Sequence, residues 1–242
     1  MKKVYVVGLG PGGIDQMTEL ARTTLEKCDV IAGYTVYLDL IKDYYEGKEF
    51  LTTGMRKEVE RCKMAVEEAL KGKTVAMVSS GDAGVYGMAG IMFEVAEAHP
   101  ELEIEVIPGI TAACSGAAVL GAPLISDFAL ISLSDLLTPW EKIEKRLELA
   151  AAADFVICLY NPSSFKRHDY LQKACDIMMR NQRKDVPAGI IRNIGRDGET
   201  YEIMTLEELR EAKVDMFTTV IVGNSQTRVI NNKMVTPRGY KL

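Results

Sequence analysis

The stretch Val4-Tyr5-Val6-Val7-Gly8-Leu9-Gly10-Pro11-Gly12-Gly13, near the start of the chain, decides the fold class. Val4–Gly8 is a short apolar run, and a strand that is apolar on both faces is typical of a parallel sheet covered by helices. The glycine-rich turn Gly8–Gly13 follows at the carboxyl end of this strand, where α/β proteins bind ligands. The stretch therefore predicts an α/β protein with a ligand-facing loop in its first turn.

Gly8–Gly13 also fits the G-x-G-x-x-G fingerprint of dinucleotide-binding proteins, so an NAD(P)-dependent oxidoreductase is one interpretation. Such a site normally has an acidic residue at the end of the second strand, but here Val30–Gly33 runs into Tyr34, and Asp29 stands at its beginning. Pro11 removes a backbone donor from the loop. A plain tight turn explains the glycines equally well, and glycines also let a planar ligand approach the backbone closely.

The rest of the chain alternates short apolar runs with amphipathic helices, which predicts α/β structure throughout. The small, apolar segment Ala112–Pro123 indicates a junction between an N-terminal domain, residues 1–112, and a C-terminal domain, residues 113–242. The expected strands are Val4–Gly8, Val30–Gly33, Val75–Ser79, Ile104–Ile107, Phe128–Leu133, Phe155–Leu159, Ala188–Arg192 and Thr218–Val222. The expected helices include Arg56–Lys71, Glu141–Ala153 and Leu171–Asn181.

The Arg56–Lys71 helix shows an apolar stripe formed by Val59, Cys62, Val66, Ala69 and Leu70. Its first turn follows Thr53-Gly54-Met55 and carries Arg56 and Lys57, whose charges oppose the helix dipole. An anionic ligand would relieve that conflict. Further basic residues, each of which alone is more typical of a solvated surface, lie near other predicted loops: Arg192, Arg196, Arg228 and Arg238.

Ser79-Ser80-Gly81-Asp82-Ala83-Gly84 follows another predicted strand. Small residues with one carboxylate suit an adenosyl ligand, because the backbone can bind its amino-acid part while Asp82 pairs with an ammonium or a ribose hydroxyl. The alternative is that Asp82 caps the next helix. Similar turns, rich in Gly, Asn, Ser or Thr, make a ligand cleft plausible: Pro108–Ala113, Leu159–Pro162, Ile191–Arg196 and Val220–Ser225.

Composition restricts the function further. The net charge of -5 argues against non-specific binding of nucleic acid. The five cysteines show no C-x-x-C spacing and mostly lie in apolar surroundings, so we expect free, buried thiols in a cytoplasmic protein. With two histidines in the chain we expect no metal site. Met1-Lys2-Lys3 leads directly into a strand, and no apolar run reaches ~20 residues, so we expect neither a signal peptide nor a membrane span.

Taken in order, Gly8–Gly13, Ser80–Gly84 and Pro108–Ala113 resemble the signature of the tetrapyrrole methylases. The resemblance covers essentially the whole chain and is closest to the precorrin-3B C-17 methyltransferase subfamily of cobalamin biosynthesis. The most specific stretch is Ser132–Trp140, and Ser126 departs from the pattern because the subfamily usually has histidine there. The stretches that narrow the match are Gly33–Tyr37, Thr53–Arg56, Ile131–Trp140, Asp215–Thr219, Ser225–Thr227 and Met234–Tyr240.

The resemblance implies two α/β domains with S-adenosylmethionine held in a cleft between them, and a homodimer. It also implies that the Gly8–Gly13 loop faces the tetrapyrrole, through Gly10 and Gly12, with Pro11 near the cofactor. The residues carried over as cofactor contacts are Pro11, Ser80, Gly81, Asp82, Val85, Thr111, Ala112, Leu159, Asn193 and Ile194.

The chemistry implied is transfer of a methyl group to a ring carbon, which needs no metal, together with contraction of the macrocycle and closure of a lactone. Contraction requires proton transfers, for which Tyr34, Asp127 and Asp135 are the candidates. The carboxylates of the substrate give Arg56, Lys57, Arg192 and Arg196 a binding role. Methylation of C-11 or C-20, or tetrapyrrole binding without catalysis, remain alternatives, and the sequence leaves open whether the substrate contains cobalt.

Overall fold

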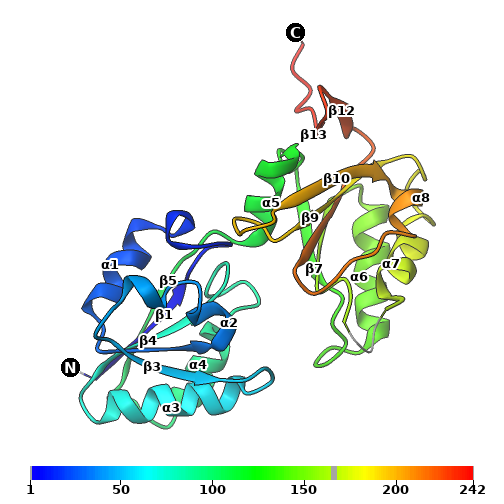
Figure 1. Ribbon diagram of the computed structural model, residues 1–242. Helices are drawn as coiled ribbons and strands as arrows, with labels where there is room; N and C mark the ends of the chain where they lie inside the picture. The colour runs from blue at the N-terminus through cyan, green and yellow to red at the C-terminus, as the bar shows by residue number, and fades with distance from the viewer. Residues whose placement is uncertain (1, 165–167, 242) are drawn as a thin grey trace. The chain divides into compact units, whose positions relative to one another are not determined.

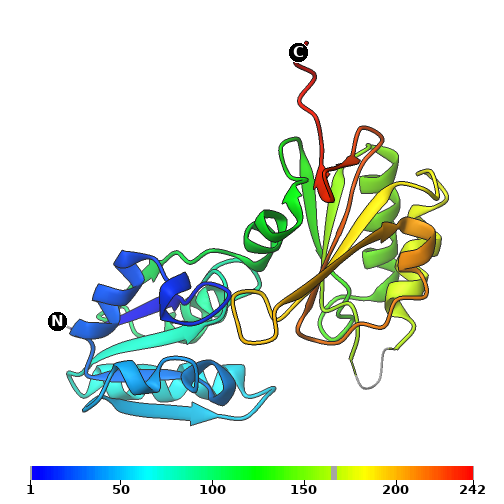
Figure 2. The same cartoon turned by 45° about the horizontal axis from the view of Figure 1, so that its top comes forward.

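The computed structural model describes residues 2–164 and 168–241, and the chain forms two compact units, Met1–Ala112 and Ala113–Leu242 (Figure 1). Each unit is built on its own five-stranded sheet with helices packed against it (Figures 1 and 2). This confirms the predicted α/β fold class.

The first unit contains a wholly parallel sheet with the strand order β3-β2-β4-β1-β5. Its strands are β1 (Lys3–Gly8), β2 (Val30–Tyr34), β3 (Glu49–Thr53), β4 (Thr74–Ser79) and β5 (Glu103–Ile107). Its helices are α1 (Glu19–Lys27), α2 (Thr35–Leu38), α3 (Glu58–Leu70) and α4 (Ala89–Ala96), and α5 (Ala112–Leu120) leads into the second unit. The edge strand β3 was missed because Glu49-Phe50-Leu51-Thr52-Thr53 is short and only partly buried.

The parallel sheet is apolar on both faces, as its sequence predicted. Val4 and Val6 of β1 point to one face, where they join buried residues of α3 and α4. Val7 follows Val6 along the strand and so points to the opposite face, where it joins Leu25 of α1 and Leu38 of α2. The alternation follows from the two-residue repeat of a strand, and it makes this unit a three-layer sandwich.

The second unit contains a mixed sheet with the strand order β10-β9-β11-β8-β7. Strand β11 is antiparallel to both of its neighbours, and the edge strand β7 is parallel to β8. The strands are β7 (Phe128–Ser132), β8 (Val156–Tyr160), β9 (Pro187–Arg192), β10 (Thr200–Thr205) and β11 (Thr218–Val222). The helices α6 (Trp140–Ala152), α7 (Tyr170–Met178) and α8 (Leu206–Leu209) pack on this sheet, and β6 (Gly121–Ala122), β12 (Arg228–Ile230) and β13 (Lys233–Val235) form a small separate sheet.

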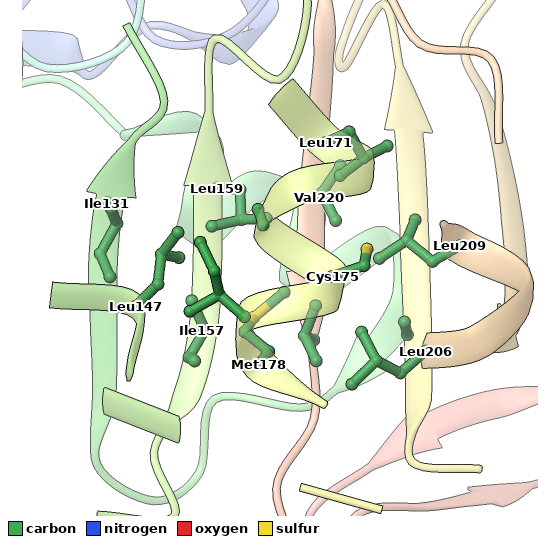
Figure 3. Close-up of a cluster of buried hydrophobic side chains, with 14 of the residues drawn as sticks. Ile131, Leu147, Ile157, Leu159, Leu171, Cys175, Met178, Leu206, Leu209 and Val220 are labelled. Atoms are coloured by element: carbon green, nitrogen blue, oxygen red, sulfur yellow. The ribbon is translucent and has the colours of Figure 1, made fainter. Parts of the chain in front are cut away.

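Figure 3 shows the main core of the second unit, where Leu171, Cys175 and Met178 of α7 lie among apolar side chains such as Ile157 and Leu159 of β8. The other face of the sheet is covered by α5. There, Leu120 packs so closely on Gly189 of β9 that a Cβ at Gly189 would lie 2.5 Å from a Leu120 methyl carbon. Gly189 therefore allows the helix to lie directly on the strand.

The structure corrects two details of the helix expected over Arg56–Lys71. Helix α3 begins at Glu58, so Arg56 lies in the preceding turn, where its φ of 63° is incompatible with a helix. The buried face consists of Arg61, Cys62, Ala65, Val66 and Ala69, and Val59 is 52% exposed. Val59 therefore lies at the surface, and an arginine lies on the buried face of the helix.

Candidate active site

The carboxyl edge of the first sheet is assembled from loops that touch backbone to backbone. The amide of Gly10 donates to the carbonyl of Gly81 at 3.0 Å, and the amide of Gly81 donates to the carbonyl of Gly10 at 2.7 Å. A Cβ on Gly8 would lie 2.7 Å from the amide nitrogen of Gly109 and 2.7 Å from the carbonyl oxygen of Gly81. Gly8 and Gly109 allow the loops after β1, β4 and β5 to meet, because a Cβ at either position would collide with backbone atoms of a neighbouring loop.

Asp82 fastens these loops through its carboxylate, and it does not cap a helix. Its Oδ1 accepts from the amides of Gly84 at 2.8 Å and Val85 at 3.0 Å, and its Oδ2 accepts from the amide of Gly109 at 3.0 Å. Helix α4 begins at Ala89, seven residues after Asp82 along the printed sequence, so the alternative of an N-cap is wrong. Oδ2 still has accepting capacity for a ligand, since an ionised carboxylate offers about four lone-pair positions, two on each oxygen, and both on Oδ1 are taken.

Other residues carried over as cofactor contacts surround this edge. Pro11 is buried, whereas Ser80, Thr111 and Ala112 are half-buried and Val85 is 36% exposed. Next to them, Ser79 is 5% exposed, and its Oγ has no hydrogen-bond partner among the described residues. A buried hydroxyl without a partner is unfavourable, so a ligand with a polar group at this edge would satisfy it.

Tyr34 lies at the same edge, at the end of β2, opposite Thr53 of β3 in the strand register. Its ring meets that of Tyr37 edge-on, with centroids 5.3 Å apart and planes at 89°. The guanidinium carbon of Arg61 lies 5.9 Å from the Tyr34 centroid. The structure thus places the candidate proton donor Tyr34 beside a buried cation.

Arg56 and Lys57 differ in how they are neutralised. Lys57 forms an exposed ion pair with Glu60 at 2.6 Å, and Glu58 and Glu60 occupy the first turn of α3, so the helix supplies its own counter-charges. The exposed Arg56 has no hydrogen bond or ion pair to any residue in the described part of the chain. Arg56 is therefore the better placed of the two for a ligand carboxylate.

In the second unit, one edge of the sheet collects the ends of β7, β8 and β9 and the start of β11. Ser132 pairs with Tyr160 in the register of β7 and β8, and Thr218 pairs with Arg192 in that of β11 and β9. The side-chain Nδ2 of Asn161 donates to Ser132 Oγ at 2.9 Å, and Tyr160 Oη accepts from the backbone amide of Ala113 at 2.7 Å. We call this edge, defined by Ser132–Asp135, Tyr160–Asn161 and Arg192–Arg196, the Asn193 edge.

The two candidate aspartates of this unit lie at opposite ends of β7. Asp135 belongs to the Asn193 edge, and the hydroxyl of Tyr170 donates to its Oδ2 at 2.6 Å. Tyr170 in turn packs against Trp140, with ring centroids 4.4 Å apart. Asp127 and the neighbouring Ser126 precede β7 and are exposed, with the Asp127 carbonyl accepting from the amide of Val156. The structure therefore does not bring Asp127 to the edge that holds Asp135.

The remaining predicted contacts of the second unit differ in backbone conformation, in burial and in whether they already have a partner. Asn193 adopts a left-handed conformation, with φ of 51°, in the turn that also carries Arg196. Ile194 is 7% exposed, and Leu159 is fully buried in the core, so a ligand would meet Leu159 through its backbone alone. Arg192 is already engaged, with Glu202 at 2.7 Å and the carbonyl of Lys213 at 2.8 Å.

The turn Val220–Ser225 lies at the edge of the second sheet that is opposite the Asn193 edge. Because β11 runs antiparallel to β8 and β9, its end lies beside their beginnings, and Val222 pairs with Ile157 and Ala188. There Ser225 Oγ donates to Asp154 Oδ2 at 2.6 Å, and Asn224 Nδ2 donates to the Asp154 carbonyl at 3.2 Å. Sequence reasoning could not foresee this, since strand direction is not visible in a run of apolar residues.

Sequence reasoning also missed Arg61 and Tyr170. Arg61 falls on the apolar face of α3 at the spacing of Cys62 and Ala65, and a charge on such a face was the available signal. Tyr170 gave none, because its partner Asp135 is 35 residues away.

The five cysteines are free, and all except the exposed Cys114 are buried. Burial raises the pKa of Cys158 to about 12 and that of Cys62 to about 11. Among residues 2–164 and 168–241 no group of His, Cys, Asp and Glu could hold a metal ion, and no helix there is long and apolar enough to cross a membrane.

A family described as Tetrapyrrole (Corrin/Porphyrin) Methylases matches residues 3–210. The chain therefore belongs to the tetrapyrrole methylase family. Its relatives include the Cobalt-factor III methyltransferase of Priestia megaterium, 45% identical over 244 residues, which cover 99% of this chain and 45% of that protein.

A second relative is the Probable cobalt-factor III C(17)-methyltransferase of Salmonella typhimurium, 45% identical over 238 residues, which cover 98% of this chain and 99% of that protein. The chain thus spans under half of the first relative and nearly all of the second.

Solved structures give the same fold. The methyltransferase CobJ superposes with a TM-score of 0.90 at 39% identity, covering 97% of this chain and 99% of that one. The uroporphyrin-III C-methyltransferase of Thermus thermophilus, solved with S-adenosylhomocysteine, superposes with a TM-score of 0.74 at 21% identity, covering 91% and 97%. The latter supports the fold alone.

Proposed function

We propose that the protein is an S-adenosylmethionine-dependent C-methyltransferase that methylates C-17 of cobalt-factor III or precorrin-3B, with ring contraction, in cobalamin biosynthesis. The observation that carries the proposal is the convergence of the Gly8–Gly10, Ser79–Asp82 and Pro108–Thr111 loops on one edge of the first sheet. The names of the relatives favour the cobalt-containing substrate.

The residues at that edge fit an adenosyl cofactor. The unsatisfied Ser79 hydroxyl and the accepting position left on Asp82 Oδ2 would meet its polar groups. The proposed contacts of the first unit are Pro11, Ser80, Gly81, Asp82, Val85, Thr111 and Ala112. For the second unit, the proposed contacts are Leu159, Asn193 and Ile194. When bound, S-adenosylmethionine supplies a methyl group attached to a sulfonium sulfur. Transfer of the methyl group leaves that sulfur in a neutral thioether. The protein's part is to orient the two ligands and exclude water.

For the proton transfers of ring contraction, we propose Asp135 rather than Asp127. Asp135 shares the Asn193 edge with other proposed ligand contacts, and the Tyr170 hydroxyl fixes its orientation. Tyr34, at the edge of the first sheet, remains the candidate from that unit. Asp135→Asn would retain the hydrogen bond from Tyr170 but lose the base, so it should lower kcat far more than it raises KM for the tetrapyrrole.

For the substrate carboxylates we propose Arg56 as the principal contact, with Lys57, Arg192 and Arg196 contributing less and the Gly10–Gly12 backbone lying against the macrocycle. Arg56→Ala should weaken tetrapyrrole binding by about 1.5–3 kcal/mol, the range of charge-assisted hydrogen bonds. Arg56→Lys should weaken it less, because charge is retained and the bidentate fork is lost. S-adenosylhomocysteine affinity should be unchanged in both variants.

The decisive experiment is incubation with methyl-labelled S-adenosylmethionine and either cobalt-factor III or precorrin-3B, followed by mass spectrometry and NMR of the product. One labelled methyl at C-17 of a ring-contracted product is expected. Methylation at C-11 or C-20 would place the protein in another branch of the family. Tetrapyrrole binding without turnover would indicate a carrier.

An oxidoreductase is tested separately by calorimetry. S-adenosylhomocysteine should bind with an affinity on the order of micromolar, and NAD and NADP should not bind. Tight NAD binding without S-adenosylhomocysteine binding would contradict the proposal.

We further propose a cytoplasmic homodimer. Five free thiols suit a reducing compartment. The homodimer is proposed from the resemblance to the tetrapyrrole methylases, and light scattering should then give about twice the 26.7 kDa mass of the chain.

A further inference from the structure

Arg61 is a charged side chain in the interior of the first unit. It lies on α3 and is 4% exposed. Its Nε donates to Thr53 Oγ1 at 2.8 Å, its Nη2 donates to the Gly54 carbonyl at 3.1 Å, and its Nη1 lies 3.9 Å from the sulfur of Met88. All of these partners are neutral, and Arg61 forms no ion pair with any residue of the described chain. A buried arginine usually has a carboxylate partner.

The partners of Arg61 belong to separate segments that meet at the carboxyl edge of the sheet. Thr53 ends β3, Tyr34 ends β2 opposite it, and Met88 precedes α4. The Arg61 guanidinium lies over the Tyr34 ring, and Gly54 opens the turn that leads to Arg56. One side chain therefore links the aromatic ring, the turn and the helix.

Stability of the fold does not explain this arrangement. Burial lowers the pKa of the Arg61 guanidinium, because removing the charge from water is unfavourable. Apolar residues of similar size often replace such buried charges without loss of stability. Thr53 is half-buried and Gly54 is exposed, so water can satisfy both groups if the guanidinium is removed.

We propose that Arg61 is a positioning residue for the anionic substrate. It holds the Thr53–Arg56 turn in the conformation in which Arg56, at a φ of 63°, presents its free guanidinium, and it fixes the plane of the Tyr34 ring. Arg61 itself does not touch the substrate. This inference rests on the proposed function, because it assumes that the ligand at this turn is a polycarboxylate.

The test uses Arg61→Met and Arg61→Lys, with Lys63→Met as the matched control. Lys63 is an exposed cation on the same helix, so its variant loses the same charge without touching the turn. For Arg61→Met we expect an unchanged or higher melting temperature and unchanged S-adenosylhomocysteine affinity. The KM for the tetrapyrrole should rise about tenfold or more, with kcat changed by less than about threefold. Arg61→Lys should restore part of the KM, and Lys63→Met should match the wild type.

A second readout does not depend on activity. Arg56 and Lys57 are trypsin sites within the turn, and cleavage there requires the turn to open. Trypsin followed by mass spectrometry should show cleavage after Arg56 several-fold faster in Arg61→Met than in Lys63→Met. Equal cleavage rates and an unchanged KM in an active wild-type background would overturn the inference.

The remaining outcomes are equally distinct. If Arg61→Met does not fold while Arg61→Lys behaves as the wild type, Arg61 is a structural cation and the inference is wrong. If the wild-type protein methylates neither tetrapyrrole, the proposed function fails. In that case the cleavage comparison still decides whether Arg61 holds the turn.

Discussion

The two units hold their functional edges by different means. In the first unit all strands are parallel, so every loop that follows a strand reaches the same edge, and glycines let those loops touch backbone to backbone. In the second unit β11 runs against its neighbours, so the loops after strands are divided between two edges. The position of a motif after a strand therefore locates a site in the first unit, whereas in the second the direction of each strand must also be known.

The edge of the second unit that lies opposite the Asn193 edge is held by side chains. Thr227 is buried, and its hydroxyl accepts from the amide of Asn224 at 2.9 Å and bonds the hydroxyl of Thr236 at 2.8 Å. Thr236 follows β13, so this network fastens the small C-terminal sheet to the end of β11. Backbone packing in one unit and a polar network in the other predict different sensitivities to substitution.

The largest effect is expected for Gly109→Ala. The new Cβ would lie 2.6 Å from both the carbonyl carbon and the carbonyl oxygen of Gly8, and neither backbone atom can move without disturbing the sheet. We expect a loss of about 3 kcal/mol in the free energy of unfolding, the upper range for overpacking, measured by urea titration. Gly13→Ala is the control, because a Cβ there meets nothing within 4 Å, and it should stay within about 0.5 kcal/mol of the wild type.

Thiol labelling can show where Gly109→Ala acts. Cys28 and Cys62 are buried in the first unit, and Cys158 and Cys175 in the second. Labelling in low urea, followed by mass spectrometry, should show Cys28 and Cys62 reacting earlier than in the wild type. Unchanged labelling of all four thiols would mean that the loops can separate without strain.

The next effect concerns Asp82, the polar counterpart of the glycine packing. Asp82→Ala removes a carboxylate that accepts from three backbone amides and should destabilise the protein by about 2 kcal/mol. Asp82→Asn keeps one oxygen and should cost about 1 kcal/mol. Asp82→Asn should also weaken S-adenosylhomocysteine binding by about 1.5–3 kcal/mol if the carboxylate meets the ammonium group. Stability that falls while affinity is unchanged would leave Asp82 with the structural role alone.

A smaller effect is expected in the second unit for Thr227→Val, which keeps the shape of the side chain. It removes the acceptor of the Asn224 amide and the partner of Thr236, so we expect a loss of about 1.5 kcal/mol by urea titration. Val229→Thr, at an exposed position of β12, should stay within about 0.5 kcal/mol. An unchanged free energy of unfolding in Thr227→Val would show that water replaces the hydroxyl and that the network is not buried in solution.

The sequence predicts the buried strands better than the exposed edge strands and the turns. Buried strands such as Val4–Gly8 were predicted because a strand apolar on both faces is a local feature of the chain. Strand β10 was missed because Thr200-Tyr201-Glu202 is an exposed edge with little apolar character. The start of α3 was placed too early because Arg56 and Lys57 are good helix formers, whereas the turn depends on the left-handed conformation of Arg56.

For the candidate site, motifs located the loops and tertiary structure decided their roles. Asp82 was identified, but its contact with Gly109 joins residues 27 positions apart. Asp127 and Asp135 are indistinguishable by residue type, and the direction of β7 alone separates them. The charge of Arg61 on the apolar face of α3 was the one local signal of its burial, and its contacts with Thr53 and Gly54 appear only in the folded structure.

The smallest effect is a loss of stability at alkaline pH. Burial raises the pKa of Cys28, Cys158 and Cys175 to about 12 and that of Cys62 to about 11, whereas an unfolded thiol ionises near about 8.5. The folded state therefore keeps protons that the unfolded state releases. The stability that these thiols contribute is complete below about pH 8.5 and is lost as the pH rises toward 11 or 12.

Because each unit contains two such thiols, both should lose stability over the same alkaline range, unlike the one-sided effects of the substitutions above. The single tryptophan, Trp140, reports the second unit by fluorescence, and circular dichroism reports the whole chain. We expect the urea midpoints from both probes to fall together above about pH 9. At about pH 8, iodoacetamide should label the exposed Cys114 in the folded protein and all five thiols after unfolding. A midpoint that rises with pH would contradict the direction of the pKa shifts, because the folded state would then be the one that releases protons.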